Sequence, residues 1–369
     1  MIVDAIPRCS RVVVLSIVCK CFIFLVLSLF VLSSRAVASG YEIGVYYYPG
    51  WYTRYDGVRP ITQWDKIRQF PERMPLIGWY PEGSVQVMEG QIAQMHEYGL
   101  SFVAFDWYYR PGRKIQLDHA ISAFINSNNK GLMKFSVLWA NHDKMPTSLG
   151  DWDQMVQYWI DNYFEDPQYY RIENKPVVFV FSADQLETDA RKFSSSAAIL
   201  LSRAQAAAHA AGLPGIYFIG CVSGSAPLVS RFAAGSGYSA FSAYNYHAAP
   251  DSRIQSHSYA ELVSDYEVHW QKFAEAQKLP IVLPLTAGWD HRPLGPSGDP
   301  LHDLSRGTPE QFLSHLMRAK SFLDSHKHLT HGAAVICCWN EYGEGSYIEP
   351  AFGTGYTYLE KIRSVFGGP

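Results

Sequence analysis

Residues 333–350 read AAVICCWNEYGEGSYIEP, and the character of this stretch changes at its midpoint. The first part is a continuous run of small and β-branched apolar residues, which predicts a strand buried on both faces. Polar and aromatic residues follow, with the carboxylates Glu341 and Glu344 directly after the strand. In parallel α/β proteins, ligands bind at the C-terminal ends of the strands, so we expect the functional site here.

The composition is that of a large globular chain. The 369 residues are 48% hydrophobic and 18% charged, which is enough to bury a sizeable core. A net charge of −3 without a basic run gives no indication of nucleic-acid binding. Aromatic residues make up 15% of the chain, and flat rings with a polar edge suit sugar binding as well as core packing.

The N-terminal residues 1–38 have the three parts of a signal peptide. The basic residues of the first part are Arg8, Arg11 and Lys20. Residues 21–34 carry no charge, and Ala36-Val37-Ala38 matches a cleavage site. We therefore expect the folded part, residues 39–369, to be exported to the periplasm or secreted.

A second interpretation joins residues 12–32 into one membrane anchor, since about 20 apolar residues can span a bilayer. Lys20 in the middle of this segment and the Ala-Val-Ala end favour cleavage. The membrane is thus a partner only through the N-terminal segment, if that segment stays uncleaved.

The six cysteines do not form a disulfide or zinc pattern. Three of them, Cys9, Cys19 and Cys21, lie in the leader, and the remaining Cys221, Cys337 and Cys338 contain no CxxC pair. Neighbouring residues on a strand point to opposite faces, so we expect Cys337 and Cys338 to be small, unpaired core residues.

Apolar strand-like runs alternate with helical patterns along the whole exported region. The predicted strands are residues 43–48, 101–107, 133–139, 176–181, 215–222, 240–244, 281–285 and 333–338. The predicted helices are residues 85–98, 117–125, 152–164 (with Asp151 as N-cap), 194–211, 228–234, 259–278, 309–323 and 356–366. Eight such units predict a single (β/α)₈ TIM barrel.

A doubly wound sheet alternates in the same way, but it usually carries a glycine-rich nucleotide turn after its first strand. Here that turn reads YPGWY at residues 48–52, with one glycine. The barrel is therefore the favoured fold.

Six of the predicted strands end in clusters of Trp, Tyr, Asn and Asp. Because the C-terminal ends of barrel strands meet at one face, these residues should form one cup. Rings for stacking, with amides and carboxylates for hydroxyl groups, favour a carbohydrate site over simple caps on the barrel. The candidate substrate-binding residues are Tyr47, Tyr48, Trp51, Asp106, Trp107, Trp139, Asn141, Tyr244, Asn245, Tyr246, Trp289, Asp290, Asn340 and Tyr342.

Three histidines, His142, His247 and His291, also lie at predicted strand ends. A sugar contact and a structural role are equally compatible with their positions.

Glu341 and Glu344 are the candidate catalytic residues. On a continuing strand, residues three apart would face opposite ways, but Gly343 and Gly345 allow the chain to turn and bring both into one mouth. Glycoside hydrolysis usually needs two carboxyl groups, one of them kept protonated as the acid. The alternative is a surface loop with two solvated glutamates.

The stretch WNEYGEGSYIEP at residues 339–350 resembles the W-N-E-W-x-E-G-x-x-I-E-P signature of glycoside hydrolase family 99 and the related WbsX-like proteins. Residues 46–52 and 75–80 are similar to the opening Y-Y-x-W-Y and P-x-L-G-x-Y segments of that family. The resemblance covers the whole exported region. It implies a retaining endo-α-mannosidase on a (β/α)₈ barrel that works without a metal or other cofactor.

The resemblance also implies roles for the two glutamates. Glu341 matches the carboxylate that assists the 2-hydroxyl of the substrate as internal nucleophile, through a 1,2-anhydro sugar. Glu344 matches the general acid, which then activates water as a base. Tyr342 and Gly343 stand where the family often has Trp and His, and these departures bear on mannoside specificity more than on hydrolysis.

Three alternatives remain. WbsX-like proteins are often labelled glycosyltransferases, but sugar nucleotides are cytosolic, and the D-x-D at residues 151–153 lies at a predicted helix start. A non-catalytic polysaccharide-binding barrel would not need both glutamates. Metal-dependent hydrolysis finds no HExxH among 13 histidines. The sequence thus favours an exported retaining glycosidase acting on an α-linked oligo- or polysaccharide.

Overall fold

The computed structural model describes residues 40–55, 60–110, 113–142, 146–233 and 235–367. The predicted signal peptide lies outside these residues. Within them, none of the helices combines the length and the hydropathy needed to cross a membrane.

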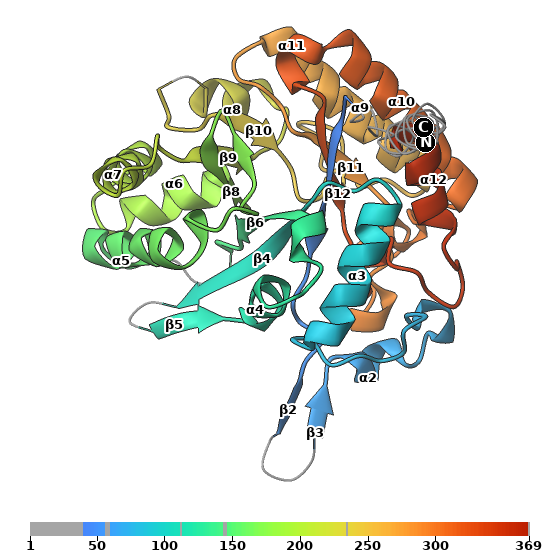
Figure 1. Cartoon of the computed structure of the whole chain (residues 1–369). Coiled ribbons are helices and arrows are strands. Elements are labelled where there is room, and N and C mark those ends of the chain that lie inside the picture. Colours follow the sequence, from blue (N-terminus) through green and yellow to red (C-terminus); the bar gives the residue numbers. More distant parts are fainter. Residues whose placement is uncertain (1–39, 56–59, 111–112, 143–145, 234, 368–369) are drawn as a thin grey trace, which may run out of the picture. The chain divides into compact units, whose positions relative to one another are not determined.

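The described residues form eight parallel strands that neighbour one another in chain order (Figure 1). These strands are β1 (Glu42–Tyr47), β4 (Phe102–Arg110), β6 (Lys134–Trp139), β8 (Lys175–Val180), β9 (Tyr217–Cys221), β10 (Ala240–Ser242), β11 (Leu283–Thr286) and β12 (Ala333–Cys337). β12 pairs with both β11 and β1, and a parallel bridge from Phe241 to Ile281 connects β10 to the segment before β11. This order confirms the predicted α/β barrel, because a doubly wound sheet reverses direction at a switch point.

Side-chain alternation divides the strand residues between two buried layers. Tyr46 and Val335 belong to the cluster inside the barrel, whereas Tyr47 and Ile336 belong to the layer between strands and helices. Because all eight strands are parallel and covered by helices, both faces are apolar. This explains why the strands appear in the sequence as continuous apolar runs.

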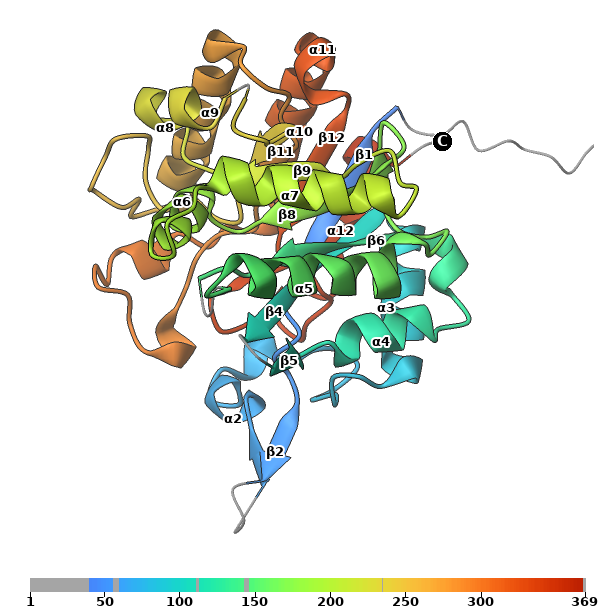
Figure 2. The same cartoon turned by 90° about the vertical axis from the view of Figure 1, so that its left-hand side faces the viewer.

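Helices cover the outside of the strands (Figures 1 and 2). They are α3 (Val85–Glu97), α4 (His119–Ile125), α5 (Leu149–Trp159), α6 (Ala183–Arg191), α7 (Ala197–Ala210), α8 (Ala226–Arg231), α9 (Tyr259–Ala276), α10 (Pro309–Ser325) and α12 (Thr357–Phe366), with the short α2 (Trp64–Ile67) and α11 (Lys327–Thr330). A π-helical turn, Ile160–Phe164, extends α5 to the predicted end of that helix.

Two helix predictions were wrong in detail. The N-cap of α5 is Ser148, whose hydroxyl accepts a hydrogen bond from the backbone N–H of Asp151, so the helix begins three residues earlier than expected. α6 was not predicted, because its sequence ADQLETDAR is mostly polar and only a narrow side of it is buried.

Short strands extend the barrel at loops. β2 (Thr53–Tyr55) and β3 (Pro60–Thr62) form a hairpin that projects from the barrel in Figure 1, and β5 (Arg113–Gln116) pairs with the end of β4. β7 (Arg171–Ile172) pairs with β8. β13 (Asn340–Glu341) and β14 (Ser346–Tyr347) form a second hairpin directly after β12.

The expectation of two unpaired cysteines at the end of β12 was wrong. Cys337 and Cys338 form a disulfide bond, and the peptide bond between them is cis. β12 ends at Cys337, so strand alternation no longer governs Cys338, and both side chains belong to the cluster inside the barrel. Cys221 is the free cysteine of the described residues and is buried in the same cluster.

The close packing inside the barrel leads to a prediction of how a single added methyl group changes the stability of the protein. Gly44 faces the interior, and a Cβ atom there would lie 2.1 Å from the ring of Phe102 on the neighbouring strand. Gly44→Ala should therefore lower the free energy of unfolding by about 1–3 kcal/mol. The measurement is equilibrium denaturation monitored by circular dichroism.

Gly90→Ala is the matched control. Gly90 is exposed in the middle of α3, and a Cβ atom there would meet nothing within 4 Å. Helix propensity predicts a gain of about 0.5–1 kcal/mol for this substitution. Equal behaviour of the two variants would contradict the packing described for the interior.

Candidate active site

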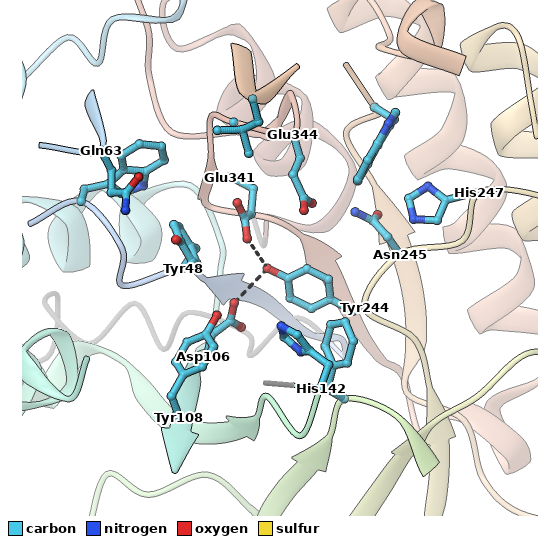
Figure 3. A pocket seen from close by; sticks show the side chains of 15 residues that line it. Tyr48, Gln63, Asp106, Tyr108, His142, Tyr244, Asn245, His247, Glu341 and Glu344 are labelled. Atoms are coloured by element: carbon cyan, nitrogen blue, oxygen red, sulfur yellow. Dashed lines mark hydrogen bonds between the residues drawn. The ribbon is translucent and has the colours of Figure 1, made fainter. Parts of the chain in front are cut away.

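A cavity of about 320 Å³ lies at the C-terminal ends of the barrel strands (Figure 3). This volume is within the range of about 300–1,000 Å³ that is usual for small-molecule sites. The residues that line it are Tyr48, Trp51, Gln63, Asp106, Tyr108, His142, Phe181, Tyr244, Asn245, His247, Trp289, Leu294, Glu341, Gly343 and Glu344. The ends of seven of the eight barrel strands thus contribute to one site, and β9 is the exception.

The structure brings half of the sequence-predicted site residues into this cavity. They are Glu341, Glu344, Tyr48, Trp51, Asp106, Tyr244, Asn245 and Trp289. Glu341 and Glu344 enter from the same side and point toward Tyr244 (Figure 3). The predicted juxtaposition of the two carboxyls with aromatic walls is therefore present.

Three predicted residues face away from the cavity because of strand alternation. Tyr47, Trp107 and Trp139 point into the layer between strands and helices. The Tyr47 hydroxyl donates a hydrogen bond to Glu82, and the Trp107 indole lies against Trp159. These three side chains support the barrel wall and do not reach a ligand in the cavity.

Five further predicted residues hold loops together. The amide of Asn141 pairs with the backbone N–H and C=O of Ser182, and the Tyr246 hydroxyl donates to the carbonyl of Val222. The others, Asp290, Asn340 and Tyr342, do not line the cavity and fix the position of the β13–β14 hairpin, to which Asn340 and Tyr342 themselves belong. Their contacts are the carboxylate pair of Asp290 with Arg73 and Arg292, the bonds of Asn340 to Tyr48, and the bond of Tyr342 to Glu349.

Seven lining residues were not among the sequence candidates. Tyr108 and Phe181 lie two residues beyond Asp106 and Phe179, so the period-two rule, extended past the strand ends, would have found them. Gln63, Leu294 and Gly343 come from loops, for which the sequence carries no comparable signal. His142 and His247 were undecided between a sugar contact and a structural role, and both line the cavity.

The β13–β14 hairpin presents both glutamates. Glu341 pairs with Ser346 across the hairpin, and residues 342–345 make the turn that the glycines predicted. Gly345 has φ +69°, a backbone region that glycine adopts readily. A Cβ atom at Gly343 would lie 2.7 Å from a methyl of Leu294, so a close approach explains this glycine.

Asn340 ties the base of the hairpin to the end of β1. Its side-chain oxygen accepts from the Tyr48 N–H at 2.8 Å, and its amide donates to the Tyr48 carbonyl at 2.9 Å. The indole N–H of Trp51 donates to the Asn340 carbonyl at 2.9 Å. Glu341 therefore follows a residue that is anchored through both its side chain and its carbonyl, which limits the freedom of Glu341 to reorient.

Two arginines hold the turn of the hairpin. Arg73, which is 2% exposed, donates to the carbonyls of Tyr342 at 2.8 Å and Asp290 at 3.0 Å. Arg306 donates to the carbonyls of Gly345 and Tyr347. Guanidinium groups that bridge carbonyls of different segments restrict the turn that carries Glu344.

The two glutamates differ in their surroundings. Burial raises the pKa of Glu341 to about 7, and a hydrogen bond from Tyr244 opposes this rise. Burial raises the pKa of Glu344 well above its usual range, and the nearby charges of Glu341 and Asp106 raise it further. Among the described residues, the Glu344 carboxyl has no hydrogen-bond partner of its own. The proton therefore favours Glu344 and the negative charge favours Glu341.

A pair of histidines forms another part of the wall. His302 Nδ1 lies 2.7 Å from the carbonyl oxygen of Ser256, and its Nε2 lies 2.9 Å from His247 Nδ1. The rings of His247 and Trp289 pack edge to face with their centroids 4.3 Å apart, and the Trp289 indole N–H donates to Ser297. His247 is thus held in place on two sides.

This geometry determines the tautomers. Burial lowers the pKa of both rings, that of His247 to about 4, so both are neutral at pH 7. A carbonyl only accepts, so His302 carries its proton on Nδ1 and accepts at Nε2. His247 must then donate from Nδ1, which leaves its Nε2 as an acceptor for a ligand hydroxyl. In the described residues, no group of three or more His, Cys, Asp or Glu side chains is arranged to hold a metal ion.

Comparison with known families agrees with the signature at residues 339–350. The family model described as Glycosyltransferase WbsX matches residues 68–362, which is most of the chain. The chain belongs to the WbsX family. The resemblance predicted from the sequence is therefore confirmed, whereas no functionally curated protein matches the chain.

Solved structures of glycoside hydrolases share the fold of this WbsX-family protein. The GH99 endo-alpha-mannosidase from Bacteroides thetaiotaomicron, in complex with bis-tris propane, has a TM-score of 0.62 at 14% identity, covering 88% of this chain and 95% of that chain. A glycoside hydrolase-like protein has a TM-score of 0.62 at 15% identity, with 88% and 94% covered. The fold is thus a glycosidase-like (β/α)₈ barrel.

The histidine geometry of this WbsX-family protein leads to a spectroscopic prediction. His247 and His302 should both appear as Nδ1–H tautomers at neutral pH. Two-bond ¹H–¹⁵N correlation spectra of protein labelled with [¹⁵N]histidine measure this, with assignments from His247→Gln and His302→Gln.

His269 is an internal control, because it should be the opposite tautomer. Its Nδ1 accepts from the Gly224 N–H at 2.8 Å and its Nε2 lies 3.0 Å from the Ala248 carbonyl, so it should be the Nε2–H tautomer. A proton on Nε2 of His247 would contradict the direction of the histidine chain.

Proposed function

We propose that this protein is an exported retaining glycoside hydrolase that cleaves an α-linked, mannan-like or bacterial surface polysaccharide. The observation that carries the proposal is the pair Glu341 and Glu344, presented by one hairpin into one aromatic-walled cavity with opposite preferences for the proton. Glycosidases need this combination of a protonated and an ionised carboxyl at the scissile bond.

In the proposed first step, Glu341 takes the proton of the substrate 2-hydroxyl, and O2 attacks the anomeric carbon. The glycosidic bond breaks, and Glu344 gives its proton to the leaving oxygen. The product is a 1,2-anhydro sugar, with Glu341 protonated and Glu344 ionised. Glu344 is suited to this role because its carboxyl is free of protein partners in the described site and faces the cavity.

In the second step, Glu344 accepts a proton from water, and the water oxygen attacks the anomeric carbon. The C1–O2 bond breaks, and O2 recovers its proton from Glu341. Both glutamates return to their starting states. Two inversions at the same carbon give overall retention of the anomeric configuration.

The mannan-like substrate is proposed from the fold neighbour that is named an endo-alpha-mannosidase and is bound to bis-tris propane, a polyhydroxylated amine. The cavity of this chain contains three carboxyl groups, so it also suits a cationic molecule with several hydroxyl groups. Of the two departures from the signature, Tyr342 is buried outside the cavity and Gly343 lines it. A change of substrate preference would therefore act through Gly343 and the adjacent Leu294.

A transferase that uses a sugar nucleotide is the second candidate, since the family carries that description. The described lining residues contain three carboxyls and neither Lys nor Arg, which disfavours a diphosphate. The D-x-D residues do not reach the cavity, because Asp151 caps its own helix region through Thr147 and Asp153 pairs with Arg203 on the surface. Export is proposed from the N-terminal signal pattern, and the Cys337–Cys338 disulfide supports an oxidising compartment.

A screen of the purified protein separates these functions. α-Mannans and bacterial surface polysaccharides are incubated with the wild type, and the products are analysed for chain length and anomeric configuration. Shortened chains with retained configuration are expected. Consumption of nucleotide sugars alone would favour the transferase, and binding without cleavage would favour a non-catalytic barrel.

Substitution of the two glutamates should separate their roles. Glu341→Gln and Glu344→Gln should each reduce turnover of polysaccharide by about 10²–10⁴-fold, because each removes one proton-transfer group. On an α-glycosyl fluoride, Glu344→Gln should release fluoride in a single turnover at nearly the wild-type rate, since fluoride leaves without a proton. Glu341→Gln should remain slow on this substrate.

Glu360→Gln is the matched control, since Glu360 is exposed on α12, away from the cavity. It should behave as the wild type in both assays. Circular dichroism should show all three variants folded. Full activity of Glu341→Gln or Glu344→Gln on polysaccharide would refute the proposed function.

The pH dependence of the activity should follow the ionisation of Glu341. With its pKa raised to about 7, activity should fall as pH decreases through this value, because the base becomes protonated. Tyr244→Phe removes the hydrogen bond that stabilises the ionised form, so the acidic limb of kcat/KM should move to higher pH. An acidic limb that stays in place in Tyr244→Phe would contradict this assignment.

A further inference from the structure

Asp106 forms a third buried carboxyl group in the cavity, and the proposed two-step reaction does not use it. The Tyr244 hydroxyl lies between this group and the proposed base, 3.0 Å from Asp106 Oδ2 and 2.8 Å from Glu341 Oε1 (Figure 3). Both distances are those of hydrogen bonds. The hydroxyl therefore connects the two carboxyls.

A count of protons shows that the three groups cannot all be in their usual states. Tyr244 has one hydroxyl proton, which makes one well-aligned hydrogen bond. If both carboxyls were ionised, the second contact would place oxygen lone pairs against each other with no proton between them. One of the two carboxyls must therefore donate a proton to the Tyr244 oxygen.

The environment assigns that proton to Asp106. Its Oδ1 atom is buried without a hydrogen-bond partner, and the residue is 4% exposed. An ionised oxygen in such a position carries the full cost of desolvation. Neither oxygen of Glu341 is buried and unpaired in this way, and its carboxyl faces the cavity. The charge is better placed on Glu341.

We propose that Asp106 is a protonated positioning residue, whose carboxylic O–H donates to Tyr244 so that Tyr244 donates to Glu341 and keeps it ionised. The assignment of Glu341 as the base rests on the function proposed above, whereas the proton on Asp106 does not. Burial and the charge of Glu341 raise the pKa of Asp106 well above its usual range, in the same direction.

Apart from His142, the groups that face Asp106 from the surrounding elements supply no compensating cation. From the described part of the chain they are Tyr46 and Tyr48 at β1, Tyr108 on β4, His142 after β6, Cys221 on β9, Tyr244 after β10, and Glu341 and Glu344 on the hairpin. Apart from His142, these groups are neutral or acidic at pH 7. Removal of the proton from Asp106 would therefore leave two adjacent carboxylates competing for one hydroxyl.

Infrared spectroscopy of the full exported domain tests the proton without a substrate. The wild-type spectrum at pH 7 should contain a carboxylic-acid C=O band that is absent in Asp106→Asn. Labelling with [4-¹³C]aspartate should shift this band, which assigns it to Asp and separates it from a band of Glu344. If Asp106→Asn does not fold, the labelled wild type alone decides. Absence of any protonated Asp band at pH 7 would overturn the proposal.

Kinetics tests the positioning role. Asp106→Asn keeps a donor toward Tyr244 and cannot ionise, whereas Asp106→Leu fills similar space without a donor. On the α-glycosyl fluoride, where Glu344 is not needed for departure, Asp106→Leu should be about tenfold slower than Asp106→Asn, because only Asn still donates to Tyr244. At alkaline pH the wild type should lose activity as Asp106 ionises, and Asp106→Asn should not.

These outcomes are separable from the fate of the proposed function. If the wild type cleaves no glycan but the Asp band is present, the function fails and the proton on Asp106 stands. If the wild type cleaves a glycan and Asp106→Asn is as slow as Asp106→Leu, or keeps the alkaline loss, the positioning role is refuted while the function stands.

Discussion

Three carboxyl groups line one cavity, two of them share the hydroxyl of Tyr244, and this constraint governs the C-terminal end of the barrel. Like charges at close range in a poorly solvated site cannot all ionise. The surroundings therefore decide which group keeps its proton. Glu341 accepts a hydrogen bond from the Tyr244 hydroxyl, and the Glu344 carboxyl has no hydrogen-bond partner among the described residues. The Oδ1 atom of Asp106 is buried without a partner in the same part of the chain.

The rest of this end of the molecule holds those groups in register. Asn340 and Trp51 fix the base of the hairpin, and Arg73 and Arg306 fix its turn. Behind the hairpin, Glu349 accepts hydrogen bonds from side chains of three segments, which are Tyr80, Gln91 and Tyr342. The aromatic residues of the signature, Trp339, Tyr342 and Tyr347, are thus buried in the support of the site, and none of them lines the cavity.

Much of the fold and about half of the site could be predicted from local sequence. Apolar runs alternating with helical patterns indicate a parallel barrel, because only a sheet covered on both sides has strands of this kind. The strand ends correctly located the cavity, but the candidates taken from each cluster were not sorted by the face of the strand on which they lie. Because side chains alternate along a strand, Asp106 and Tyr48 point into the cavity whereas their neighbours Trp107 and Tyr47 point toward the helices. The same rule would have identified Tyr108 and Phe181 as lining residues.

The sequence by itself determined the barrel, its family and the two glutamates of the hairpin, since periodicity and a short motif are local properties of the chain. Only the tertiary structure decided that Asp106 joins them through Tyr244, that His302 sets the tautomer of His247, and that Cys337 bonds to Cys338. Asp106, Tyr244 and Glu341 lie more than 95 residues apart in the chain. Their protonation depends on burial and distance, which exist only once the barrel has closed.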